Sequence, residues 1–222
     1  MSKLFSFTAD ENQRIADAVK QAESNTSGEL VPYIVDRSDH YNETPVYAAI
    51  SGAIFIVIIL NVLSLLWLLP FKFDTLNFSI LIIGFMALVY LPVAFIKPLK
   101  RMMTNPRKMD NMVNRRALQA FVEEEVFNTR DRTGVLIFIS AFEHRVELIA
   151  DSGITDKTEP DYWESIVDDL ILGIKKKQTP EALAKAVEEC GRLLKEAGFD
   201  RKPDDTDELS NDLRTDTFQE EK

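Results

Sequence analysis

Apolar residues along this chain gather in two long blocks that carry no charge. No Asp, Glu, Lys or Arg occurs from position 44 to 71 or from position 75 to 96. A bilayer core of about 30 Å is crossed by roughly 20 apolar helical residues. We therefore predict two transmembrane helices, at 46–69 and 76–96, joined by a short external loop at 70–75. The alternative is a pair of buried helices in a soluble core, which a chain of 222 residues is too short to wrap on all sides.

Charges beside the second block predict the orientation of this hairpin. Up to position 116 the block is followed by one acid, Asp110, and by seven bases: Lys97, Lys100, Arg101, Arg107, Lys108, Arg115 and Arg116. Basic residues favour the cytoplasmic side, so we expect both termini there. Since neither block contains Asp, Glu, Lys, Arg or His, we expect the hairpin to be an anchor and not an ion path. The bases can alternatively contact anionic lipid headgroups.

The remaining residues alternate between helical and strand patterns. Apolar, β-branched runs predict strands at 29–35, 134–140 and 145–150. Helical patterns cover about 8–25, 105–128, 160–175 and 179–198, the first of them opened by a capping box at Thr8 and Glu11. The first two strands are joined through a helix and should be parallel, with the third antiparallel to the second. Pro32 cannot donate to a ladder, so its strand should lie at a sheet edge or carry a bulge.

These elements predict an α/β fold, a small mixed β-sheet flanked by helices. We expect one cytoplasmic domain split into residues 1–45 and 97–199 by the transmembrane hairpin. The helix over 105–128 should bury an apolar face, which contains Met109, Val113, Leu118, Phe121 and Val122. Residues 200–222 hold nine acids and four bases with few large apolar groups, which is typical of a disordered acidic tail.

Composition narrows the possible functions. The formal net charge of −10 argues against a protein that binds nucleic acid through phosphate contacts. A single cysteine, Cys190, excludes an internal disulfide, and it falls on the apolar stripe of the last helix as a small core residue. His40 and His144 are the two histidines, which leaves little material for a histidine-based metal or catalytic site.

Two segments carry a resemblance to a known family. The run Thr26-Ser-Gly-Glu-Leu-Val-Pro32 after an amphipathic helix, and Thr133–Ser140 followed by Glu143–Ile154, resemble the TPM domain family over roughly 8–45 and 105–198. The resemblance implies an α/β/α sandwich. The chain is similar to a bacterial subgroup of this family with an inserted transmembrane hairpin. This similarity implies an integral protein of the inner (plasma) membrane. Some members resemble acid phosphatases or bind calcium, and others assist the assembly or repair of membrane complexes.

The expected sheet places acidic residues at both of its ends. Glu29, Asp151 and Asp156 should lie at one end and are the candidate metal ligands, with calcium as the ion that the resemblance implies. Asp36, Asp39, His40, Glu143 and His144 should lie at the other end. Neither group has the spacing of an EF-hand or a two-metal hydrolase, and no residue pattern predicts a catalytic set.

The favoured function is therefore an accessory or interaction module for membrane protein complexes. Its expected partners are the lipid bilayer and a membrane protein, and we expect no binding of nucleic acid. In this interpretation the protein has no enzymatic activity and no cofactor. The alternatives are a calcium-dependent, acid-phosphatase-like hydrolase and a purely structural membrane protein.

Overall fold

The two apolar blocks and the rest of the chain fold as separate units. The structure is a computed structural model that describes residues 7–68, 74–155, 158, 161–206 and 208–216. One unit comprises residues 1–39 and 109–222, and the other comprises residues 40–108. Residues 97–108, which we expected in the soluble domain, thus belong with the hairpin. The C-terminal residues belong with the α/β unit.

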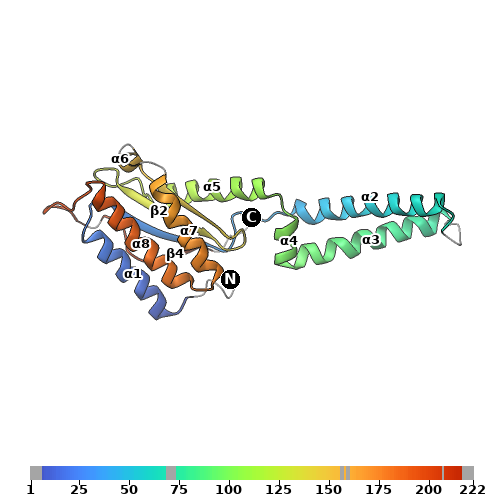
Figure 1. The fold of residues 1–222 in the computed structure, drawn as a ribbon, viewed down its shortest axis with the longest axis horizontal. Helices are drawn as coiled ribbons and strands as arrows, with labels where there is room; N and C mark the ends of the chain where they lie inside the picture. The colour runs from blue at the N-terminus through green and yellow to red at the C-terminus, as the bar shows by residue number, and fades with distance from the viewer. Residues whose placement is uncertain (1–6, 69–73, 156–157, 159–160, 207, 217–222) are drawn as a thin grey trace. The chain divides into compact units, whose positions relative to one another are not determined.

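The α/β unit is built on a four-stranded mixed sheet in the order β3-β2-β1-β4 (Figure 1). Its strands are β1 (Glu29–Val35), β2 (Gly134–Ser140), β3 (Arg145–Ala150) and β4 (Arg214–Asp216). As predicted, β1 pairs with β2 in parallel, and β2 pairs with β3 antiparallel. Because β1 and β2 are neighbours, the two halves of the chain on either side of the hairpin contribute to one sheet.

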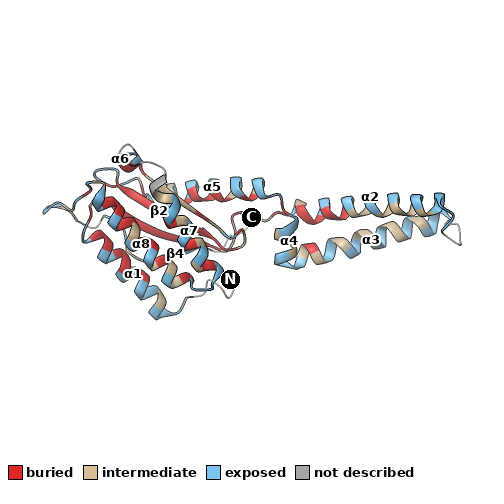
Figure 2. Ribbon diagram, viewed as in Figure 1, coloured by how far each residue is buried: buried red, intermediate tan, exposed pale blue. Residues whose placement is uncertain are grey.

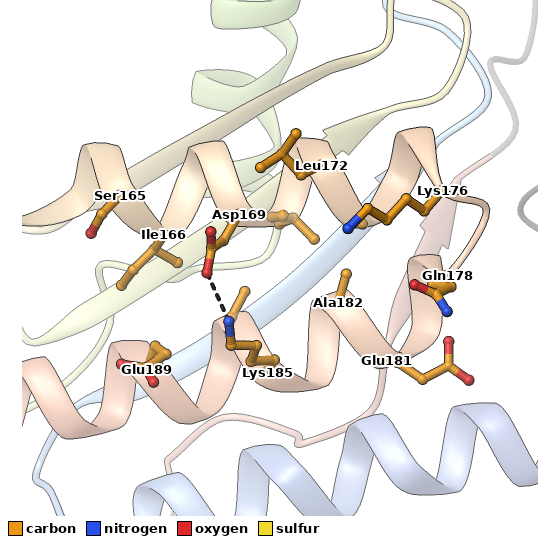
Figure 3. Close-up of a pocket in the computed structure, with 13 residues that line it drawn as sticks. Ser165, Ile166, Asp169, Leu172, Lys176, Gln178, Glu181, Ala182, Lys185 and Glu189 are labelled. Atoms are coloured by element: carbon orange, nitrogen blue, oxygen red, sulfur yellow. Dashed lines mark hydrogen bonds and ion pairs between the residues drawn. The ribbon is translucent and has the colours of Figure 1, made fainter.

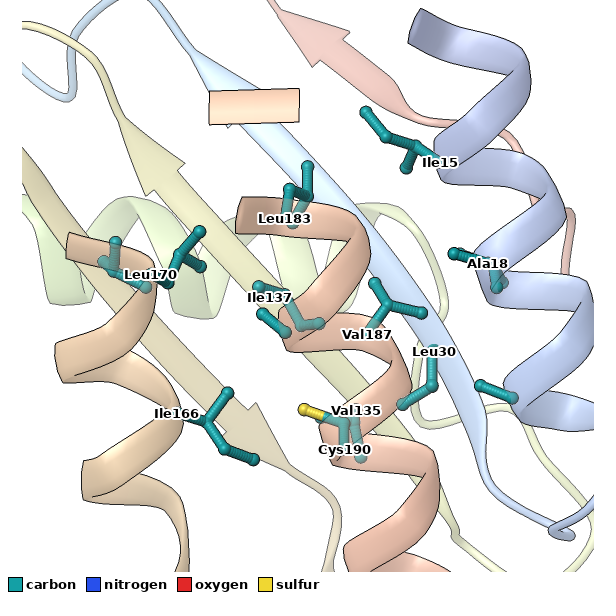
Figure 4. Close-up of a cluster of buried hydrophobic side chains, with 14 of the residues drawn as sticks. Ile15, Ala18, Leu30, Val135, Ile137, Ile166, Leu170, Leu183, Val187 and Cys190 are labelled. Atoms are coloured by element: carbon teal, nitrogen blue, oxygen red, sulfur yellow. The ribbon is translucent and has the colours of Figure 1, made fainter. Parts of the chain in front are cut away.

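One face of the sheet is covered by α1 (Ala9–Glu23), α7 (Asp161–Lys175) and α8 (Thr179–Glu196). Alternate residues of β1 face this layer, namely Leu30 and Ile34, and they pack with α1 residues such as Ile15 (Figure 4). Thr8 caps α1 in the predicted capping box. Cys190 is fully buried in this core, where burial raises the pKa of its thiol.

The opposite face is covered by α5 (Pro106–Glu123), which completes an α/β/α arrangement and confirms the predicted fold class. The prediction for α5 itself is only partly right. Met109 and Val113 are buried as expected, but Leu118 and Val122 are 50% and 61% exposed. The buried stripe continues through Arg116, Ala117 and Ala120. A regular helix turns about 100° per residue, so a position four after Val113 faces the sheet whatever residue occupies it.

The C-terminal segment differs from the disordered tail that the sequence predicts. Residues 214–216 form β4, which pairs in parallel with Tyr33–Val35 of β1. Leu213 and Leu209 also pack against the two apolar cores, one against each. Composition predicted disorder because the segment is rich in charge, but several of those charges form ion pairs with the rest of the domain: Asp216 with Arg116, Arg214 with Glu124, and Asp204 with Arg130. Residues 217–222 lie outside the described part of the chain.

The second unit contains α2 (Glu43–Leu65), α3 (Thr75–Phe95) and the short α4 (Lys97–Met103). α2 and α3 pack along each other, and a methyl group added at Gly52 would lie 3.3 Å from Phe85 and Val89. Asp74 caps α3 by accepting a hydrogen bond from the Asn77 amide. At the base of the hairpin, the Thr44 and Thr104 hydroxyls lie 3.1 Å apart. Most of the predicted loop, residues 70–73, is outside the described residues.

Both long helices meet the length and composition of a membrane span. In the most apolar 18-residue stretch of each helix, only 17% of α2 and 6% of α3 is buried. Most of the surface of both helices is exposed or half-buried (Figure 2). The large apolar side chains that remain exposed include Ile54, Phe55, Ile58, Ile80, Ile83 and Leu88.

Candidate functional site

The candidate metal ligand Glu29 binds the C-terminal segment. Glu29 is buried at the start of β1, and its two carboxylate oxygens accept hydrogen bonds from the backbone amides of Glu208 and Leu209, at 3.2 and 3.3 Å. The neighbouring buried carboxylate of Glu23 accepts from the Leu30 amide and from the Asn211 side chain, both at 2.9 Å. Glu29 at the start of β1 and Glu23 at the end of α1 thus hold residues 208–211 in place.

The second candidate, Asp151, interacts with a different part of the chain. Its Oδ1 accepts hydrogen bonds from Arg132 Nη2 at 2.9 Å and from the Ser152 amide at 2.7 Å. Its Oδ2 lies 2.7 Å from Arg132 Nε in an ion pair that lacks hydrogen-bond alignment. An arginine that pairs with both oxygens of Asp151 neutralises its charge and occupies the positions that a cation would need.

Asp156, the third candidate, lies outside the described residues. Among the residues that are described, no group of three or more His, Cys, Asp or Glu side chains could hold a metal ion. Calcium binding and the phosphatase activity associated with it therefore stay predictions from the family resemblance.

The polar residues at the other end of the sheet form a buried link between β1 and β2. Ser38 Oγ and Ser140 Oγ lie 2.9 Å apart, Ser140 Oγ also hydrogen-bonds Glu143 Oε2, and the Ser38 amide donates to Glu143 Oε1 at 2.9 Å. Ser140 is fully buried, so this hydroxyl cannot meet a substrate as a nucleophile. Of the five candidates at this end, Glu143 takes part in this link. His144 is exposed in the β2–β3 turn at φ 53°, and Asp36 Oδ2 lies 3.8 Å from Arg37 Nε. Asp39 ends the first part of the α/β unit, and His40 is the first residue of the hairpin unit.

A surface groove of about 490 Å³ runs between α7 and α8 (Figure 3). Lys185 Nζ donates to Asp169 Oδ2 across it at 2.7 Å, and this hydrogen bond lowers the pKa of Asp169. The side chains of Lys185 and Asp169 are 61% and 59% exposed. An exposed ion pair of this kind contributes little stability and is readily replaced by water. This ion pair is therefore not a preorganised charge for a ligand in the groove.

A buried polar cluster lies where α5 faces β1 and β4. Arg116 is buried, and its guanidinium donates from Nη1 to Glu123 at 2.8 Å and from Nη2 to the Tyr33 hydroxyl at 3.1 Å. Nη2 also donates to Asp216 Oδ2 at 2.6 Å. Tyr33 is fixed in turn by stacking on Phe138, with ring centroids 5.8 Å apart.

Burial and charge act in opposite directions on this cluster. Burial alone lowers the pKa of Arg116, but the hydrogen bonds to Glu123 and Asp216 outweigh it and raise the pKa above its ordinary value. Burial alone raises the pKa of Glu123, yet the hydrogen bond from Arg116 leaves it lowered. Burial raises the pKa of the Tyr33 phenol. The cluster is therefore a fixed cation with one carboxylate partner from its own helix and another from the C-terminal segment.

Sequence reasoning missed this cluster because Arg116 was counted only among the bases that follow the second apolar block. A usable signal was present. Position 116 falls three residues after Val113 and seven after Met109, so it lies on the apolar stripe of the helix. A charged residue on such a stripe is rarely buried without a partner.

These features define a class: a helix-flanked mixed α/β domain with an inserted hairpin of two apolar helices. No protein-family model and no curated protein matches this chain. The chain is similar to the BA42 protein from the psychrophilic bacterium Bizionia argentinensis, known from an NMR structure, with a TM-score of 0.58 and 22% sequence identity. The match covers 97% of this chain and 100% of that chain. At this level of identity the likeness shows the fold alone.

Proposed function

We propose that this protein is a membrane-anchored interaction module. In this proposal, α2 and α3 cross the bilayer, and the TPM-like α/β domain remains at one membrane surface as an accessory of a membrane protein complex. The observation that carries the proposal is the exposed apolar surface of the hairpin. Contiguous apolar surface of this extent is stable only when lipid or another protein covers it.

The charges after α3 support an orientation in which both termini are cytoplasmic. Lys97, Lys100 and Arg101 follow α3 directly, and Arg107 and Lys108 come shortly after. Bases within about 15–20 residues of a membrane span favour the cytoplasmic side. Reporter proteins fused at Phe73 and after Lys222 should therefore report opposite sides of the membrane. Reports from the same side would contradict the hairpin topology.

Membrane insertion is tested by extraction of isolated membranes at alkaline pH. The full chain should stay with the lipid and enter solution only with detergent. A matched variant in which residues 45–103 are replaced by a short Gly/Ser linker should be recovered without detergent. Release of the full chain by alkali alone would remove the anchor from the proposal.

The interaction role is tested by crosslinking in intact membranes, followed by purification of the full chain in several mild detergents. We expect a membrane protein to be recovered with the full chain in stoichiometric amounts and to be lost from the variant in which a linker replaces residues 45–103. Recovery of the chain alone after crosslinking, in every detergent, would reject the interaction role while leaving the anchor intact.

A further inference from the structure

The edge of β1 that faces β4 is only partly covered. On its other side β1 pairs with β2 through all seven residues, whereas β4 pairs only with Tyr33–Val35. The Leu30 amide points to Glu23 and the Asp36 amide donates to Asp216 O, so even-numbered positions of β1 direct their backbone groups to the β4 side. Pro32 falls in this set and has no amide to donate. The ladder therefore lacks one donor at Pro32, and the pairing with β4 begins at the next residue, Tyr33.

Two charged side chains beside this edge, Arg116 and Glu124, pair with charged residues of β4. Arg116 receives Asp216, and Glu124 lies 2.5 Å from Arg214 Nε. Residues two apart on a strand point to the same face, so Arg214 and Asp216 both face α5. The edge is therefore complementary to a strand in which a basic residue is followed two positions later by an acidic one.

Arg116 has two partners outside β4. Its guanidinium donates to the partly exposed Glu123 on the same helix and to the hydroxyl of the buried Tyr33. The segment that fills the edge is held mainly by polar contacts, from Glu23 and Glu29 to residues 208–211 and from Arg116 and Glu124 to β4. Thr215 is exposed, the pairing spans three residues, and Leu209 and Leu213 are the apolar side chains that pack on the cores from residues 208–216. Segments with few buried apolar contacts open locally at low free-energy cost.

We propose that this edge of β1 is a strand-binding site for an extended segment of a partner protein, which carries a basic and an acidic residue two positions apart and displaces β4. Strand addition to a sheet edge supplies affinity through backbone hydrogen bonds, and the flanking charges supply register and specificity. The C-terminal segment is then an internal occupant that keeps the edge covered until the partner arrives. This inference rests on the proposed interaction role, because it names the surface that the partner contacts.

The test measures binding of a fluorescent, C-terminally amidated peptide with the sequence of residues 208–216 to the full chain in detergent. Asp216→Lys should open the edge by repelling β4 from Arg116, and Leu213→Ala should open it by removing an apolar contact with the core without a change of charge. Both variants should bind the peptide about tenfold more tightly than the parent chain, since the internal competitor is weakened. Asp212→Lys is the matched control: its charge change is the same, but the Asp212 side chain accepts a hydrogen bond from Ser210 within the segment.

A second peptide, in which the residues equivalent to Arg214 and Asp216 are exchanged, has identical composition and should bind at least tenfold more weakly. Equal affinity of the two peptides, or equal affinity of the parent, Asp216→Lys and Leu213→Ala chains, would overturn the proposal. Peptide binding by Asp212→Lys as tight as by Asp216→Lys would also overturn it. The measurement uses purified chain and peptide only, so its outcome is separate from the recovery of a membrane partner.

Discussion

Arg116 on α5 donates a 2.6 Å hydrogen bond to Asp216 on β4, although 100 residues separate them in the chain. The same nitrogen donates to Tyr33 on β1 at 3.1 Å, so one guanidinium joins three segments. This contact explains how a highly charged C-terminal segment becomes part of the sheet.

Loss of the Arg116 side chain should lower stability substantially. Arg116→Ala removes the hydrogen bonds to Glu123, Tyr33 and Asp216 and leaves a gap beside the core, so we expect a loss of about 2 kcal/mol in urea unfolding. The control is Arg192→Ala, which removes an exposed arginine paired with Glu189 and Glu196 on α8 and should cost less than about 0.5 kcal/mol. Similar losses in the two variants would show that the Arg116 cluster adds nothing beyond a surface ion pair.

Replacement of Glu147 should stabilise the protein at neutral pH. Burial, and then the negative charge of Asp110, raise the pKa of this carboxyl in the folded state. A raised folded-state pKa means that stability falls as pH rises from the unfolded value through the folded one. Glu147→Gln removes this loss, so the variant should melt at a higher temperature than the parent at pH 7 and at the same temperature below about pH 4. Glu188→Gln, at an exposed position of α8, should change neither melt. A gain that is undiminished in acid would contradict the electrostatic cause.

An added methyl group at Gly134 should disrupt the start of β2. A Cβ atom there would lie 2.0 Å from the carbonyl oxygen of Val126, which is backbone and cannot rotate away. We expect Gly134→Ala to cost about 3 kcal/mol or more in urea unfolding. Gly84→Ala is the control, because a Cβ atom on α3 meets no atom within 4 Å among the described residues. A Gly134→Ala chain as stable as Gly84→Ala would place Val126 elsewhere.

The α/β unit should fold without the hairpin. Thr44 and Thr104 are in contact at the hairpin base, so a short Gly/Ser linker in place of residues 45–103 spans the gap without strain. We expect a monodisperse protein in the absence of detergent, with mixed α/β circular dichroism and a cooperative melt. Residues 105–222 alone lack β1, the strand between β2 and β4, and should melt without cooperativity. The reverse result would mean that residues 1–44 are a separate appendage.

Local pattern was sufficient for most of the elements. The alternating and continuous apolar runs predicted β1, β2 and β3 with their observed bounds, and the capping box at Thr8 predicted the start of α1. For α5, the pattern predicted its existence but misassigned Leu118 and Val122. A helix with apolar residues on more than one side does not reveal which side faces the sheet, since that depends on the layer against which it packs.

The sequence by itself determined that two apolar stretches are long enough to span a bilayer, that the remaining chain is mixed α/β, and that β1 pairs in parallel with β2. Each of these follows from periodicity, length or connectivity, which are properties of neighbouring residues. Only the tertiary structure decided that Glu29 binds the amides of residues 208 and 209, that Asp151 pairs with Arg132, and that Asp216 completes the Arg116 cluster. Those contacts join segments that lie far apart in the chain, and a carboxylate's partner is set by which charge the fold places within hydrogen-bonding distance.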